Sequence, residues 1–135
     1  EKILKRTEIV LVLTVFLSIC FTTFASASYA QQRTLLDGVY TDAQVTAGED
    51  VYESSCNACH DLKFYRDMWK VWVDKPLMNF WYTIVAEMPS DNPGSLMDTE
   101  YTNILANILS EMGFPSGDTE LDPNKGMDQI TIVMP

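Results

Sequence analysis

The five residues Cys56-Asn57-Ala58-Cys59-His60 decide how this chain is interpreted. Two cysteines that stand two residues apart and are followed at once by a histidine form the attachment motif of a c-type haem. The two thiols can form thioether bonds to the haem vinyl groups, and the adjacent imidazole can bind the iron. The motif therefore predicts one haem c, attached covalently through Cys56 and Cys59, with His60 as a ligand of its iron.

Other uses of these five residues fit less well. A structural zinc site needs four ligands, but outside the first thirty residues the chain has only two cysteines and one histidine. A thioredoxin-type redox pair needs a βαβ setting, and the sequence shows no such alternation. A simple disulfide would leave His60 without a role.

The first thirty residues have the three parts of a secretory signal peptide. A charged start with Lys2, Lys5 and Arg6 precedes an apolar run over residues 9–24, and small residues fill 25–30. We expect cleavage after Ala30, with Ala27 as the alternative, and hence export to the periplasm of a bacterium. The apolar run is shorter than the ~20 residues of a membrane span, so an uncleaved membrane anchor is the less favoured alternative.

Residues 31–135 are expected to form one small domain, whose limited core a buried haem would complete. Removing residues 1–30 takes away three of the nine Lys and Arg and two of the nineteen Asp and Glu, which leaves a formal charge of −11. This charge argues against nucleic acid as a partner. It favours a partner with a basic docking face.

Three segments have the spacing of amphipathic helices. The first is expected over residues 42–55, with Thr41 as N-cap and with Ala43, Ala47, Val51 and Tyr52 on one face. The second begins near Pro76, carries apolar residues at 77, 80, 81, 84, 85 and 88, and ends at Pro89. The third covers residues 99–112, with Asp98 or Thr99 as its cap and Gly113 as its stop. We expect an all-α domain of about three main helices wrapped around the haem, with its core over residues 41–113.

The region after Gly113 is expected to be a wrapping tail. Residues 114–135 are rich in Pro, Gly and Asp, and residues 130–134 have the composition of a short extended piece.

Methionine is the usual second iron ligand in cytochromes c that carry electrons. His60 is the only histidine, so a second histidine from this chain is excluded. Met88 is the best candidate because it ends the apolar stripe of the second helix, where Pro89 restricts the backbone at the start of a loop. Met97 is the next candidate, Met68 lies only eight residues past His60, and an ordinary core role for Met88 is the alternative.

Several stretches resemble monohaem class I cytochromes c, and most of all the electron-accepting subunits or domains of periplasmic dehydrogenases such as quinoprotein alcohol dehydrogenases. The resemblance covers most of residues 41–121 and is carried by residues 87–96, Tyr101, residues 104–109, residues 113–117, Glu120 and Leu121. It implies the class I cytochrome c fold and, independently of the helix spacing, Met88 as iron ligand. Asn107 departs from the family, in which an aromatic Tyr is common at this position.

The segment between His60 and Lys75 allows three interpretations. Arg66, Trp69 or Trp72 can donate hydrogen bonds to the haem propionates. The lysines at 63, 70 and 75 can surround an exposed haem edge as a docking patch. The third interpretation is a solvated loop whose aromatic residues cover the haem. Four aromatic residues are expected to pack on the haem, namely Tyr52, Phe64, Phe80 and Trp81.

The expected function is transfer of single electrons from a periplasmic dehydrogenase to an oxidase or another cytochrome. With both axial positions of the iron filled, no enzyme activity is expected. One alternative is a fixed subunit of a dehydrogenase complex rather than a diffusing carrier. Another is an open iron site that senses or reacts with a small gas or peroxide, although no distal His or Arg pair supports it.

Overall fold

The computed structural model describes residues 32–61 and 63–135, and residues 32–135 form one compact unit. The predicted signal peptide, residues 1–30, lies outside the described residues. Within the described part, no helix is both long and apolar enough to cross a membrane.

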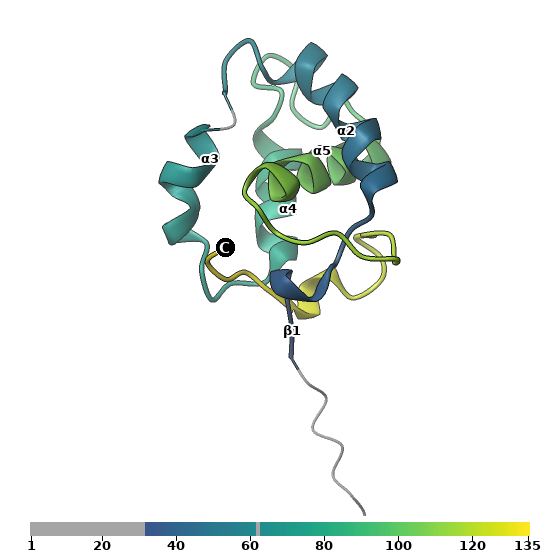
Figure 1. Cartoon of the computed structure of the whole chain (residues 1–135). Helices are drawn as coiled ribbons and strands as arrows, with labels where there is room; N and C mark the ends of the chain where they lie inside the picture. The colour runs from purple at the N-terminus through teal and green to yellow at the C-terminus, as the bar shows by residue number, and fades with distance from the viewer. Residues whose placement is uncertain (1–31, 62) are drawn as a thin grey trace, which may run out of the picture. The chain divides into compact units, whose positions relative to one another are not determined.

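The described chain is mainly helical, as the sequence predicts (Figure 1). Its elements are β1 (Arg33–Thr34), η1 (Leu35–Asp37), α2 (Asp42–Ser55), α3 (Lys63–Met68), η2 (Trp69–Val71), α4 (Leu77–Glu87), α5 (Asp98–Glu111), η3 (Met127–Gln129) and β2 (Ile130–Thr131).

The helix ends follow local rules, with small shifts from expectation. Thr41 caps α2 through a reciprocal pair of hydrogen bonds with Gln44, as predicted. Pro76 is the N-cap of α4 rather than its first residue. For α5 the N-cap is Met97, so the expectation of Asp98 or Thr99 was wrong by one or two residues. The Glu100 carboxylate accepts a hydrogen bond from the Met97 N–H at 2.8 Å, which explains the earlier start.

The sequence analysis did not predict α3 and η2. Together they turn residues 63–71 into a helical segment that buries Tyr65 and Trp69 against the core. The interpretation of residues 60–75 as a loop was therefore wrong for its central part.

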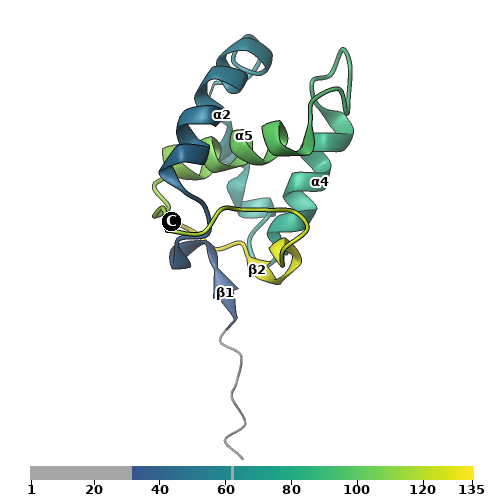
Figure 2. The same cartoon turned by 90° about the vertical axis from the view of Figure 1, so that its right-hand side faces the viewer.

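The helices α2 and α5 form the most extensive helix contact among the described residues (Figure 2). A Cβ added at Gly48 would lie 2.0 Å from the carbonyl oxygen of Asn103, so only glycine permits this approach. The buried face of α2 consists of Gln44, Gly48 and Tyr52. Ala43 and Ala47, which the spacing placed on one face with Val51 and Tyr52, are both exposed, so that spacing did not identify the buried face.

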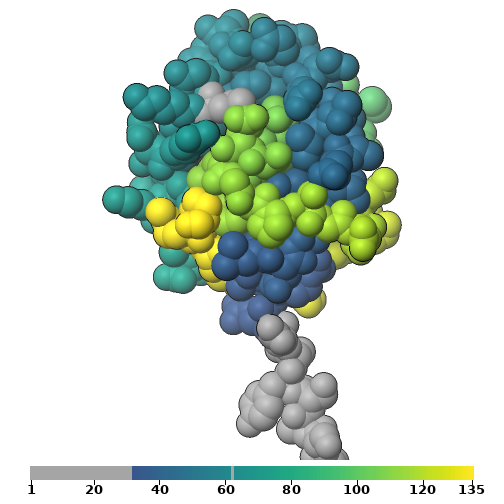
Figure 3. All heavy atoms as spheres, in the orientation of Figure 1, coloured from purple at the N-terminus to yellow at the C-terminus, as the bar shows by residue number. Residues whose placement is uncertain are grey.

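The core also includes the segments on either side of residues 41–113. The two short strands β1 and β2 pair in parallel, so residues from both ends of the unit meet. Gln44 accepts a hydrogen bond from the Leu121 N–H and donates one to the Leu121 carbonyl, both at 2.8 Å, which fixes the tail on α2. The chain after α5, coloured green, crosses the face shown in Figure 3 above the blue β1–η1 segment.

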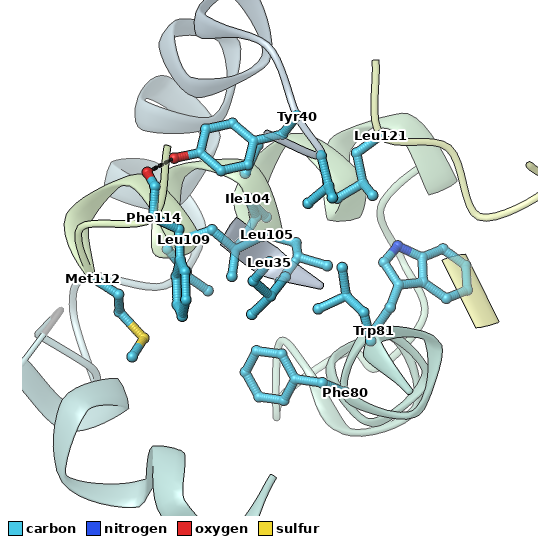
Figure 4. Packing of buried hydrophobic residues seen from close by; sticks show 14 of the residues in the cluster. Leu35, Tyr40, Phe80, Trp81, Ile104, Leu105, Leu109, Met112, Phe114 and Leu121 are labelled. Atoms are coloured by element: carbon cyan, nitrogen blue, oxygen red, sulfur yellow. Dashed lines mark hydrogen bonds between the residues drawn. The ribbon is translucent and has the colours of Figure 1, made fainter. Parts of the chain in front are cut away.

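Figure 4 shows how these segments share one apolar interior. Leu35 and Tyr40 come from the N-terminal segment, and the Tyr40 hydroxyl donates a hydrogen bond to the Phe114 carbonyl. They meet Ile104, Leu105 and Leu109 of α5, Phe80 and Trp81 of α4, and Leu121 of the tail. This core supports the elements that surround the candidate site.

Candidate functional site

The Cys-x-x-Cys-His motif forms an ordered turn that continues directly from α2. The Cys56 N–H bonds to the Tyr52 carbonyl at 2.8 Å, so the helical hydrogen bonding reaches the first cysteine. The N–H groups of Cys59 and His60 then donate to the Cys56 carbonyl at 3.1 and 3.0 Å. Five consecutive residues are thus wound into one turn, which brings both thiols and the imidazole to the same side of the fold.

His60 is half-buried beside aromatic rings. Its ring centroid lies 4.7 Å from that of Phe64 and 6.5 Å from that of Tyr65. The Tyr52 hydroxyl donates a hydrogen bond of 2.9 Å to the His60 carbonyl. Both the side chain and the main chain of His60 therefore have defined neighbours.

Met88 stands where α4 ends and the chain turns into a loop. Its N–H completes the helix by bonding to the Ile84 carbonyl at 2.9 Å, while its own backbone is already extended. The loop folds back so that the Gly94 N–H reaches the Met88 carbonyl at 3.4 Å. The Tyr101 hydroxyl donates to the same carbonyl at 2.6 Å.

A cavity of about 500 Å³ brings the predicted site residues together. Cys56, Cys59, His60 and Met88 all line it. The remaining wall is largely apolar and includes Phe64, Tyr65, Phe80, Ile84 and Ile104. This volume lies within the ~300–1,000 Å³ of small-molecule and cofactor sites, so the cavity and its donor set fit a haem held by two thioethers, an imidazole and a thioether sulfur.

The two thiols differ in exposure. Cys59 is exposed, whereas Cys56 is half-buried, and burial raises the pKa of the Cys56 thiol. At neutral pH the Cys56 sulfur is therefore a thiol rather than a thiolate.

The methionines named by the sequence analysis occupy different places. Met88 lines the cavity and so does Met68, on α3. Met97 is 65 % exposed and is not part of the cavity wall. The choice of Met88 as iron ligand stays a prediction, and its nearest rival is now Met68 rather than Met97.

Of the three side chains expected as donors to the haem propionates, two donate hydrogen bonds to backbone carbonyls of this chain instead. Arg66 Nη2 donates to the Glu111 carbonyl and Trp69 Nε1 to the Val133 carbonyl, both at 2.9 Å. The Trp72 indole N–H is buried without a hydrogen-bond partner among the described residues. Its ring packs on Phe80, with centroids 5.0 Å apart, and the Lys75 ammonium lies 5.0 Å from the Trp72 ring centroid.

The four aromatic residues expected to pack on haem divide into two pairs. Phe64 and Phe80 line the cavity. Trp81 lies in the core, where its indole N–H donates to the Thr102 hydroxyl at 3.1 Å, and Tyr52 lies behind the His60 backbone. The sequence analysis missed Tyr65, Thr83 and Ile104 as wall residues, and helical spacing from Tyr65 to Met68 and Trp69 was the signal that could have found the first.

Charge is distributed unevenly around the cavity. Glu87 and Asp91 line its wall at the end of α4 and in the following loop. Four of the six basic residues of 31–135 lie between residues 63 and 75, on and after α3, and all are exposed. Residues 32–61 and 63–135 contain no cluster of three His, Cys, Asp or Glu side chains suited to a metal ion.

In comparisons with known proteins, no family model, no curated protein and no solved structure matches this chain. The resemblance to class I cytochromes c therefore rests on the quoted residues.

Proposed function

We propose that residues 31–135 form an exported electron-transfer domain with one covalently attached haem c, in the manner of a class I cytochrome c. The observation that carries the proposal is the shared cavity, in which an attachment motif at residues 56–60 faces the same apolar space as Met88. Cofactor attachment needs the two thiols and His60 on one side, and the proposal is supported by the fact that all three residues line the same cavity.

In this proposal each site residue has a defined task. Cys56 and Cys59 would hold the cofactor by thioether bonds, and His60 and Met88 would bind its iron. When bound, the haem would supply a one-electron Fe(III)/Fe(II) couple for transfer between a reduced donor protein and an oxidised acceptor protein. If His60 and Met88 both held the iron, they would leave no position there for a substrate, so no enzyme activity is expected.

The cavity wall contributes to the same task. Phe64, Phe80, Ile84 and Ile104 give the cavity apolar wall surface, which would limit the access of water to a bound haem. A dry, apolar shell together with a thioether ligand favours the reduced form, which raises the reduction potential.

The proposed donor is a periplasmic dehydrogenase, and the proposed acceptor is an oxidase or another cytochrome. The formal charge of −11 over residues 31–135 favours transient docking on a basic face, which weakens as salt is added. A fixed subunit of a dehydrogenase complex would instead stay with its catalytic partner at high salt. Export, with or without a retained N-terminal anchor, places this exchange outside the cytoplasm.

The deciding experiment is the optical spectrum of the haem-loaded protein in wild type and in Met88→Ala. We expect the weak near-infrared band of thioether ligation to ferric iron in wild type and its loss in Met88→Ala. Met68→Ala, which also alters the cavity wall, and Met97→Ala, which alters an exposed residue, are the matched controls and should keep the band.

Each other outcome has a distinct meaning. A band that survives Met88→Ala but not Met68→Ala would move the ligand to α3. A wild type without the band, whose reduced form binds carbon monoxide readily at neutral pH, would replace the electron carrier by an open-site haem protein. A chain that takes up no haem through Cys56 and Cys59 would contradict the proposal as a whole.

A further inference from the structure

The backbone carbonyls of the two candidate iron ligands are held in the same way. The Tyr52 hydroxyl donates to the His60 carbonyl at 2.9 Å, and the Tyr101 hydroxyl donates to the Met88 carbonyl at 2.6 Å. Both tyrosines are almost fully buried, with exposed fractions of 3 % and 1 %. Neither side chain lines the cavity, so neither is placed to contact the cofactor.

The two tyrosines belong to the pair of helices with the most extensive contact among the described residues. Tyr52 lies on α2 and Tyr101 on α5, and these helices touch at Gly48 and Asn103 with no room for a side chain between them. Close-packed helices shift little relative to each other. The two hydroxyl groups are therefore mounted on one rigid support, although the residues they bind lie on a turn and at the start of a loop.

The two carbonyls differ in what else holds them. The motif turn is fixed by the hydrogen bonds at Cys56 and would also be held by two thioether bonds. Apart from Tyr101, the Met88 carbonyl has the Gly94 N–H at 3.4 Å, which is near the limit of a hydrogen bond. The Met88 side of the site thus depends more strongly on its tyrosine.

We propose that Tyr101 and Tyr52 are positioning residues, which fix the Met88 and His60 backbones to the α2–α5 pair and so set how the two side chains enter the cavity. This inference rests on the proposed function for the ligand roles of His60 and Met88. The inference adds that the Tyr101 hydroxyl, which binds the Met88 carbonyl, positions the Met88 sulfur without contacting the sulfur or the iron.

Tyr101→Phe in the haem-loaded chain tests the proposed role of Tyr101 at Met88, where the backbone depends more strongly on its tyrosine. The substitution keeps the ring and removes the hydroxyl, so the loop after Met88 should leave its position more often. A net hydrogen-bond contribution of the usual size corresponds to about a fivefold change in such an equilibrium. We expect the pH at which the thioether band disappears to fall by about 0.5–1 unit. We also expect the apparent carbon monoxide affinity of the reduced protein to rise about fivefold.

Tyr40→Phe is the matched control. Tyr40 is also buried, at 1 % exposure, and its hydroxyl also donates to a distant backbone carbonyl, but the acceptor is Phe114, which does not line the cavity as Met88 does. It loses the same kind of bond, so a general loss of stability would affect both variants. Equal shifts of the band in Tyr40→Phe and Tyr101→Phe would overturn the inference, and so would an unchanged band in Tyr101→Phe.

A second readout separates this inference from the proposed function. Amide hydrogen exchange at Gly94 reports the loop that closes on the Met88 carbonyl, whichever group binds the iron. We expect it to accelerate about fivefold in Tyr101→Phe and to stay unchanged in Tyr40→Phe. If wild type lacks the thioether band, the ligand assignment fails, while unchanged Gly94 exchange in Tyr101→Phe contradicts the positioning role itself.

Tyr52→Phe, made as a separate variant, tests the proposed role of Tyr52 at His60. It decides the inference even if Tyr101→Phe does not fold. We expect faster exchange of the His60 amide and shifted imidazole proton resonances, with the thioether band retained. Unchanged His60 resonances and exchange would overturn the role of Tyr52.

Discussion

At the scale of single residues, the indole N–H groups of Trp69 and Trp72 differ in hydrogen bonding, because the first has an acceptor and the second has none among the described residues. Trp69 is fully buried and donates to the Val133 carbonyl, so it ties η2 to the last residues of the chain. Trp72, three residues later, has a buried N–H with no partner among the described residues. Buried donors are nearly always satisfied. Trp72 does not itself line the cavity, but its ring packs on Phe80, which does. Under the proposed function we therefore predict that a haem propionate extending past Phe80 accepts the Trp72 N–H.

Trp72→Phe in the haem-loaded protein tests this assignment. If a propionate accepts the indole N–H, the variant should lose about 1.5–3 kcal/mol of unfolding free energy, the usual contribution of a hydrogen bond to a charged group. Trp69→Phe serves as the comparison, since it removes the same atoms and a known bond. Denaturant unfolding that shows Trp72→Phe as stable as wild type would mean that the N–H has no partner and would reject the propionate contact.

The cysteine, histidine and methionine side chains of the candidate site could be proposed from the sequence. The tyrosines whose hydroxyl groups bind the backbones of His60 and Met88 could not. Cys56, Cys59 and His60 are recognised by their spacing, and Met88 by its place at the end of an apolar stripe before Pro89. A tyrosine that binds a backbone carbonyl leaves no comparable pattern. Tyr101 and Met88 are 13 residues apart, and their contact depends on how α5 crosses the end of α4.

At the scale of the elements, the contact between α2 and α5 gives the sharpest test of the packing. Gly48→Ala would place a methyl group 2.0 Å from the Asn103 carbonyl oxygen, so the helices must separate. On a free helix the same change stabilises by about 0.5–1 kcal/mol, but here we expect a loss of about 3 kcal/mol, at the upper end of overpacking. Thermal or denaturant unfolding measures the difference.

The neighbouring exposed position is the control for Gly48→Ala. Glu49→Ala adds no atoms at the contact and should change the unfolding free energy by less than about 0.5 kcal/mol. A stable Gly48→Ala variant would show that the two helices can separate cheaply, which would also weaken the idea of a rigid support for Tyr52 and Tyr101.

The helix α2 could be predicted from its cap, and α4 and α5 from their repeating apolar faces. Thr41 and Gln44 form the capping box of α2, and Gly113 follows the last turn of α5. The six-residue helix α3 was missed although Tyr65, Met68, Trp69 and Trp72 have helical spacing, because so short a segment offers few repeats. Its stability comes from burying Tyr65 and Trp69, which is a tertiary effect.

At the scale of the whole molecule, the fold of residues 32–135 depends on contacts between segments that are far apart in the sequence. The parallel pairing of β1 with β2 and the two hydrogen bonds between Gln44 and Leu121 join parts of the chain that local pattern cannot relate. The sequence therefore predicted a wrapping tail but not where it lies. Folding of the unit also buries several tyrosine side chains, which makes its stability sensitive to alkaline pH.

Burial raises the pKa of Tyr40, Tyr52 and Tyr65 above the ordinary value near 10. For Tyr65 the neighbouring Tyr52 hydroxyl adds to the effect of burial. Below pH about 10 these groups are protonated in both states, so their contribution to stability is complete. Above it the unfolded chain releases protons that the folded chain retains, so the unfolding free energy falls as the pH rises toward the folded pKa values.

Tyr65→Phe isolates this effect, because it removes one of the three groups and keeps the ring that packs on Phe80 and Tyr52. We expect wild type to lose up to about 1.4 kcal/mol per pH unit above pH about 10 for each such tyrosine. The variant should lose correspondingly less, so its unfolding free energy should rise relative to that of wild type between pH 8 and pH 11. Tyr82→Phe alters a tyrosine on α4 that is 60 % exposed and should retain the wild-type slope. Parallel curves for Tyr65→Phe and wild type would show that the Tyr65 hydroxyl titrates in the folded chain as freely as in the unfolded one, which its burial in the wall of the cavity argues against.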